Sequence, residues 1–161
     1  MSRLMVAKLT EITGGEKGVC LNLYYEAHTE DPVRGEAMKA IVQLCQRCKD
    51  WEMSYVYSQY GLRYNQKNPY PYRILFVDQN LYNYEMLELH SLSCFYTKRH
   101  EEGSFAYWKM REQLKPSMIS EEQMKIILDN EKYFPRISPP TPMVRKTAGS
   151  KFSPPKKKRK R

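Results

Sequence analysis

The chain has 161 residues and a formal net charge of +9, from 27 lysines and arginines against 18 acidic residues, a length that fits one domain with a modest core. No apolar run is long enough for a signal peptide or a membrane span, so we expect no membrane partner. Residues 141–161 carry nine basic and no acidic side chains, which leaves 18 of each sign in residues 1–140, so the composition does not indicate the basic folded face of a duplex-binding domain.

The first third of the chain predicts a β-hairpin covered by a helix. Leu4–Ile12 reads as a strand, residues 14–18 as a glycine-rich turn, and residues 19–28 alternate between apolar and polar side chains, as a half-buried strand does. Asp31 and Pro32 are a favourable N-cap and first helical residue. Apolar residues then recur at spacings of three and four, which predicts a helix over residues 32–49 that lies across the hairpin.

The middle of the chain predicts further strands. Residues 53–60 are rich in tyrosine and β-prone, and residues 61–72 contain the turn-forming Asn68-Pro69-Tyr70-Pro71 and read as a loop. Ile74–Val77 is short and fully apolar, which favours a central strand. Residues 81–96 fit neither the helical nor the strand period well, and we interpret the part after Tyr84 as a strand.

Two helices are predicted before a tail. Apolar residues between Phe105 and Leu114 suggest a short helix that ends by Pro116, and Ser120-Glu121-Glu122-Gln123 is a capping box for a helix to about Tyr133. Beyond Phe134 the chain is rich in Pro, Ser, Thr and Lys and has no apolar period, which predicts disorder. We therefore expect an α+β domain over residues 1–135, with a small antiparallel or mixed sheet, one main helix and two C-terminal helices, and a disordered basic tail over residues 136–161.

The end of the chain combines two prolines with six consecutive basic residues, Pro154–Arg161. The prolines prevent a helix, and the charges cannot pack into a core. Pro155–Lys160 resembles the monopartite nuclear-localisation signal of polyomavirus large T antigens, and an upstream basic pair adds the second cluster of a bipartite signal. The resemblance implies a nuclear protein that docks on importin-α through Arg145, Lys146, Lys156, Lys157, Lys158, Arg159, Lys160 and Arg161. The alternatives are a solvated tail without a receptor, a nonspecific nucleic-acid contact and an appended tag.

A phosphorylation site precedes the basic run. Ser153-Pro154-Pro155-Lys156 matches the S/T-P-x-K pattern of proline-directed kinases. A phosphate on Ser153 adds about −1.5 to −2 charges at neutral pH. Because this charge lies beside the lysines, we expect it to weaken importin docking, whereas the simpler interpretation is an unmodified serine.

Four residues are candidate metal ligands. Cys45 and Cys48 form a CxxC pair, and His90 and Cys94 form an HxxxC pair, so together they supply the four soft or borderline ligands that zinc prefers. Lysine and arginine neighbours also favour ionised thiols. Against a structural zinc, Cys45 and Cys48 lie on the apolar stripe of a predicted helix, where cysteine behaves as a small hydrophobic residue. We therefore expect no cofactor, and keep a structural zinc as the alternative.

No catalytic motif is found: the chain lacks a nucleophile elbow, a glycine-rich phosphate loop and an HExxH motif. Asp78, Glu85 and Glu88 only faintly suggest a metal-dependent nuclease, so we expect no enzymatic activity.

Tyrosines and cations alternate in the middle of the chain. Such a surface could stack single-stranded bases, but it also fits an ordinary protein contact. We expect a nuclear, non-enzymatic interaction protein that binds another nuclear protein, a layout that small viral accessory proteins share. The alternative is a nucleic-acid-binding module that uses the tail together with Tyr55, Tyr57, Tyr60, Tyr64, Tyr70, Tyr72, Arg63, Lys67 and Arg73.

Overall fold

The computed structural model describes residues 2–32, 34–67 and 78–137. All regular structure in these residues is helical, so the predicted α+β fold with its sheet is wrong. The α-helices are α1 (Arg3–Ile12), α2 (Lys17–Glu30), α3 (Glu36–Arg47), α4 (Trp51–Lys67), α5 (Met86–Tyr96), α6 (His100–Gln113) and α7 (Glu121–Asn130). A π-helical turn, η1 (Leu81–Glu85), runs into α5, and two 3-10 turns, η2 (Pro116–Met118) and η3 (Glu131–Tyr133), flank α7.

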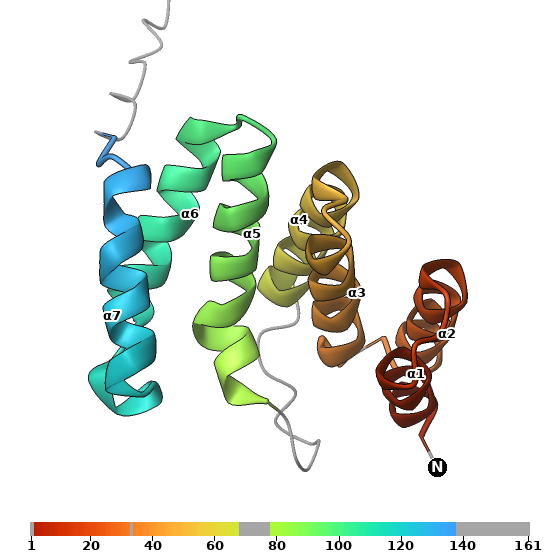
Figure 1. The fold of residues 1–161 in the computed structure, drawn as a ribbon. Helices are drawn as coiled ribbons and strands as arrows, with labels where there is room; N and C mark the ends of the chain where they lie inside the picture. Colours follow the sequence, from red (N-terminus) through yellow and green to blue (C-terminus); the bar gives the residue numbers. More distant parts are fainter. Residues whose placement is uncertain (1, 33, 68–77, 138–161) are drawn as a thin grey trace, which may run out of the picture.

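The helices follow one another from the α1–α2 pair at one end of the molecule, through α3–α4 and α5–α6, to α7 at the other end (Figure 1). From α1 to α6, consecutive helices pack against each other, and each helix makes its closest contacts within its pair, α1–α2, α3–α4 or α5–α6. Short turns over residues 13–16, 48–50 and 97–99 connect the helices within each of these pairs. None of the helices in the described part of the chain is long and apolar enough to cross a bilayer.

The predicted β-hairpin is replaced by the antiparallel pair of α1 and α2. Residues 19–28 do alternate in polarity, but the residues that the fold buries are Cys20, Tyr24, Ala27 and His28, which recur at the helical spacing of three and four. Val19 and Tyr25, on the apolar side of the predicted strand, are 48% and 56% exposed. The alternation was therefore a coincidence of composition.

The other predicted strands are also wrong where they can be compared. Residues 53–60 belong to α4, and residues 81–96 form η1 and α5. The inner face of α4 carries Ser54, Ser58 and Gly61, all buried. Because these residues are small and not apolar, a search for hydrophobic periodicity does not detect the face that they form. Residues 61–67 of the predicted loop also belong to α4, so the loop is wrong there. Residues 68–72 and the predicted strand Ile74–Val77 lie outside the described residues.

The predicted helices are confirmed with shifted ends. The helix predicted over residues 32–49 is α3, but Gly35 rather than Asp31 occupies its N-cap. The helix predicted near Phe105 is α6, which already begins at His100. The capping box is confirmed. The Ser120 hydroxyl accepts a hydrogen bond from the backbone N–H of Gln123 (3.2 Å), and the side-chain oxygen Oε1 of Gln123 accepts one from the backbone N–H of Ser120 (3.1 Å).

Three of the turns between helices share one hydrogen-bond pattern. After α1, α3 and α5 a residue with left-handed backbone follows the C-cap, namely Gly14 (φ 83°), Lys49 (φ 58°) and Lys98 (φ 62°). In each case the next N–H binds the carbonyl five residues earlier, and the left-handed residue binds the carbonyl three residues earlier. This Schellman motif satisfies the last helical carbonyls and reverses the chain. It therefore closes the α1–α2, α3–α4 and α5–α6 hairpins.

Candidate functional site

The α5–α6 hairpin brings three potential metal ligands together. His90 and Cys94 lie one turn apart on α5, and Glu102 lies in the first turn of α6. His90 Nε2 is 3.1 Å from Glu102 Oε1 and 3.5 Å from Cys94 Sγ. His90 and Cys94 are 3% and 0% exposed, whereas Glu102 is partly exposed. We call these three residues the His90 cluster; all three ligand atoms lie within 4.8 Å of one another, so the cluster could hold a metal ion.

Residues of α4 hold the cluster from the other side. Ser58 Oγ lies 2.9 Å from His90 Nδ1 and donates a hydrogen bond to the Tyr55 carbonyl. The Tyr55 hydroxyl donates to Glu102 Oε2 (2.9 Å), and its ring stacks on the His90 ring with centroids 5.5 Å apart. The Gln59 amide donates both to the Tyr55 hydroxyl and to the Glu102 carboxylate. Each residue of this network is therefore oriented by at least one other.

Burial dominates the electrostatics of the cluster. It lowers the pKa of His90 below its usual value, against the opposing influence of the Glu102 carboxylate. Partial burial alone would raise the pKa of Glu102, but hydrogen bonds from Tyr55 and His90 outweigh it and hold that pKa below its usual value. Burial raises the pKa of Cys94 to about 12. Without a metal, Cys94 is therefore a neutral thiol at physiological pH.

The same residues do not form an accessible nucleophile. Ser58, His90 and Glu102 are linked in the order of a nucleophile, a base and an acid. However, Ser58 is 0% exposed and its hydroxyl proton is engaged by the Tyr55 carbonyl. Cys94 is equally buried and is not a thiolate. A substrate carbonyl cannot reach either oxygen or sulfur in this arrangement.

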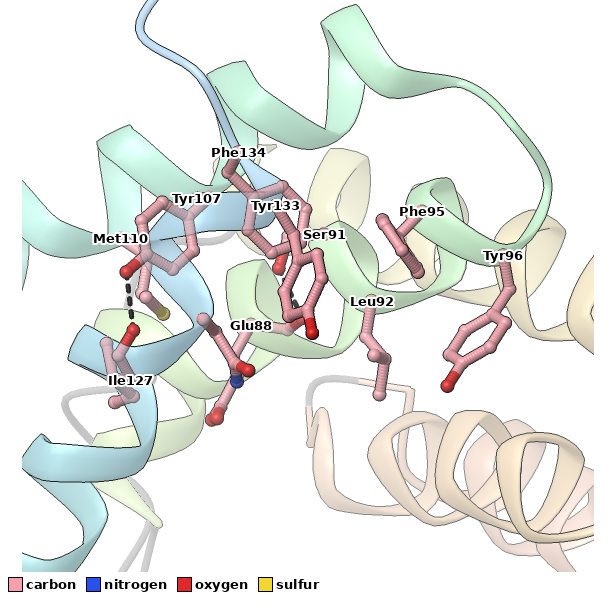
Figure 2. Close-up of a pocket in the computed structure, with 11 residues that line it drawn as sticks. Glu88, Ser91, Leu92, Phe95, Tyr96, Tyr107, Met110, Ile127, Tyr133 and Phe134 are labelled. Carbon is pink, nitrogen blue, oxygen red and sulfur yellow. Dashed lines mark hydrogen bonds between the residues drawn. The ribbon is translucent and has the colours of Figure 1, made fainter.

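A pocket of about 270 Å³ opens on the other side of α5, between α5, α6 and α7 (Figure 2). We call it the α5–α7 pocket. Its walls are mostly apolar or aromatic, and they are formed by Glu88, Ser91, Leu92, Phe95, Tyr96, Tyr107, Met110, Ile127, Asn130, Tyr133 and Phe134. Leu92, Tyr96 and Tyr133 remain 37%, 51% and 48% exposed, so apolar surface at the rim faces the solvent.

Large side chains, and not a close approach of backbones, attach α7 to α6 and create the pocket. The Tyr107 hydroxyl donates to the Ile127 carbonyl (2.6 Å), a bond that Figure 2 draws. The Tyr107 ring stacks on Phe134 with centroids 4.7 Å apart, and the Trp108 indole N–H donates to the Phe134 carbonyl. These contacts fix the end of the described chain against α6.

Glu88 adds a negative group to the pocket wall. Burial, and then the neighbouring Glu85 carboxylate, raise the pKa of Glu88 above its usual value. Among the described residues, no basic nitrogen lies within 4.0 Å of the Glu88 carboxylate. A cation brought by a ligand would therefore find an acidic partner there.

The structure separates the two halves of the predicted zinc site. Within the described residues, the His90 cluster is the one group of three or more His, Cys, Asp or Glu side chains close enough to share a metal ion, so Cys45 and Cys48 do not join His90 and Cys94. Cys45 is buried in the core, where burial raises its pKa to about 11, and Cys48 is exposed. Cys45 is therefore a core thiol, as its place on the apolar stripe indicated, whereas Cys48 is not.

The faint nuclease candidates do not form a metal site either. Lys39 Nζ lies 2.9 Å from Asp78 Oδ2 and also pairs with the Glu85 carboxylate. A lysine thus occupies the position between these carboxylates that a metal ion would need.

The predicted aromatic and cationic surface is not continuous in the described residues. Tyr55 is engaged by the His90 cluster, and Tyr57 packs against the core, whereas Tyr60 is 49% exposed. The Arg99 guanidinium lies over the Tyr55 ring, 4.0 Å from its centroid. The remaining tyrosines and cations of that prediction, apart from Arg63, have side chains outside the described set. The import residues and Ser153 also lie outside the described residues.

Sequence reasoning missed Glu102, Ser58 and Tyr107. The HxxxC pair was a usable signal, because residues four apart share one face of a helix. Its partners come from neighbouring helices, and only the pairing of α5 with α4 and α6 identifies them.

Comparison of the chain with known protein families, with curated proteins and with solved structures gives no match.

Proposed function

We propose that this chain is a nuclear, non-enzymatic interaction protein, imported through its basic tail and binding a partner protein through the α5–α7 pocket. The pocket itself is the observation that carries the proposal. At about 270 Å³ it is below the range of about 300–1,000 Å³ typical of small-molecule sites. Its aromatic walls and exposed rim instead suit one or two anchoring side chains of a protein, since such anchors dominate binding energies at interfaces.

The chemistry of the pocket defines the partner segment. The apolar and aromatic walls would accept an apolar or aromatic side chain of the partner as an anchor. Glu88 would pair with a lysine or arginine that lies beside this anchor in the partner. The combination of a small domain with an import tail is also the layout of viral accessory proteins that act on host nuclear machinery, which we offer as an analogy only. In this proposal, a metal held by the His90 cluster is separate from the partner site, because none of its three candidate ligands lines the pocket.

We expect a Leu92→Asp variant to lose partner binding by about tenfold or more, because the added charge has to be desolvated in an apolar pocket. The measurement is affinity capture from nuclease-treated nuclear extract, followed by titration of the captured partner with purified variants. Phe105→Asp is the matched control, since Phe105 is an apolar residue that is 68% exposed and does not line the pocket. Equal binding by both variants would place the partner elsewhere.

The alternative function, nucleic-acid binding, makes the opposite prediction. Its support is the interleaving of tyrosines with Arg63, Lys67 and Arg73 in the sequence, together with the nine cations of residues 141–161. If it holds, the captured partners disappear after nuclease treatment, and a chain that ends at residue 137 still binds single-stranded nucleic acid with an affinity that falls steeply with salt.

We expect alanine substitution of Lys157, Lys158 and Arg159 to abolish nuclear accumulation of the chain fused to a cargo too large to diffuse through nuclear pores. The reason is that importin-α reads the cations themselves. The measurement is the ratio of nuclear to cytoplasmic fluorescence. Ser153→Asp should lower this ratio and Ser153→Ala should preserve it; unchanged import in the triple variant would contradict the tail as the import signal.

A further inference from the structure

We propose that His90 Nε2, Cys94 Sγ and Glu102 carboxylate bind one Zn²⁺ ion, which joins α5 to α6, with Ser58 as the residue that orients His90. This inference is independent of partner binding at the α5–α7 pocket. It replaces the four-residue site that the sequence suggested, and it adds two residues, Glu102 and Ser58, that the sequence did not indicate.

The spacing of the ligand atoms fits tetrahedral zinc. With bond lengths of about 2.0–2.2 Å to nitrogen and oxygen and about 2.3 Å to sulfur, tetrahedral ligands lie about 3.3 Å (N to O) and about 3.6 Å (N to S) apart. The observed separations are 3.1 Å between His90 Nε2 and Glu102 Oε1, and 3.5 Å between His90 Nε2 and Cys94 Sγ. The sulfur and the carboxylate oxygen lie within 4.8 Å of each other.

The contacts of His90 also suit a cation among the three atoms. Ser58 Oγ lies 2.9 Å from His90 Nδ1 and 2.9 Å from the Tyr55 carbonyl oxygen. A Ser58 hydroxyl that accepts from His90 Nδ1–H would direct the Nε2 lone pair toward a metal ion. Such an ion would be shared with the Glu102 carboxylate oxygen, 3.1 Å from Nε2.

The sulfur of Cys94 distinguishes a bound metal ion from a proton shared between His90 and Glu102. A proton shared between His90 and Glu102 needs no sulfur, whereas a thiolate is among the preferred zinc ligands. The surroundings have the form of an outer shell: Ser58 orients the imidazole through Nδ1, and Tyr55 and Gln59 hold the carboxylate oxygens. Such outer contacts set the tautomer of a metal-bound histidine and the direction of a bound carboxylate. Water can supply the fourth ligand beside the partly exposed Glu102.

The test is titration of the reduced, chelator-stripped, full-length protein with Zn²⁺ against a chromophoric competitor. We expect one equivalent to bind. Cys94→Ser should weaken binding by about 100-fold or more, and Ser58→Ala by about 10–100-fold, the usual cost of losing an outer-shell contact. Cys48→Ser is the matched control, because this thiol is exposed and outside the cluster, and it should bind zinc as the wild type does.

A second measurement reports on the thiolate directly. Co²⁺ bound to the wild type should give a thiolate-to-cobalt charge-transfer band, and the band should be absent in Cys94→Ser and present in Cys48→Ser. Far-UV circular dichroism checks that each variant is folded. If Cys94→Ser does not fold, the same zinc titration is carried out on Glu102→Gln, at a partly exposed position, which should also bind zinc more weakly than the wild type. No zinc binding by the folded wild type, or equal binding by Cys94→Ser, would overturn the proposal and leave a metal-free hydrogen-bond network. Neither result bears on partner binding, which needs no metal in its assay.

Discussion

An Ile41→Ala variant is expected to unfold with a free energy about 2–5 kcal/mol below that of the wild type. Ile41 is 1% exposed and belongs to the core cluster that joins α1 to α5. It lies on α3, which packs between α2 and α4, so the helices on both sides cannot close the cavity without moving apart. Since small domains are stable by only about 5–15 kcal/mol in total, this loss is a large fraction of the stability.

Urea unfolding followed by far-UV circular dichroism measures this effect as a lower midpoint at an unchanged slope. The control is Ile126→Ala, the same substitution at a residue of α7 that is 53% exposed, where we expect a change within about 0.5 kcal/mol. Equal losses in the two variants would show that α3 is not at the centre of the core.

A Gly103→Val variant is expected to lose about 1–3 kcal/mol of stability through overpacking. A Cβ atom at Gly103 would lie 2.9 Å from Cys94 Cβ and 3.3 Å from the Ser91 carbonyl oxygen. Both contacts belong to α5, so α5 and α6 would have to separate. The same separation would move Glu102 away from His90, and zinc binding should weaken together with stability.

Gly18→Val is the matched control for this prediction. Gly18 also lies in a helix, but nothing is found within 4 Å of a Cβ placed on it. Adding the same three carbons there should leave stability within about 1 kcal/mol of the wild type, because helix propensity favours valine over glycine. Comparable losses at the two positions would contradict a tight α5–α6 contact.

Some local signals in the sequence were reliable, although the helix start predicted at Asp31 was not, because Gly35 occupies the N-cap of α3. The capping box at Ser120 and Gln123 satisfies backbone groups within one turn, and it predicted the start of α7 correctly. The period of α3 was equally clear, because the residues that α3 buries are apolar, among them Ile41 and Leu44. The turn predicted at residues 14–18 does contain a chain reversal, but it joins two helices and not two strands.

The fold class was mispredicted because several buried faces are polar or small. Ser54 and Ser58 on α4 and His90 and Ser93 on α5 are almost fully buried. Ser54 and Ser93 satisfy each other across the interface at 2.6 Å. A hydrophobic period cannot identify such positions, because these side chains are stable in the interior only when a partner on the neighbouring helix completes their hydrogen bonds.

The sequence alone determined the division of charge, with a neutral body and nine cations in the last 21 residues. It also determined the helices that carry their own apolar stripe or capping box, namely α3 and α7. The tertiary structure alone decided that the whole described body is helical, that Cys94 and His90 meet Glu102 and not Cys45, and that α7 leaves a pocket on α5. The physical reason is that charge and capping depend on residues close together in the chain. The burial of a polar or small side chain depends instead on what a distant helix places opposite it.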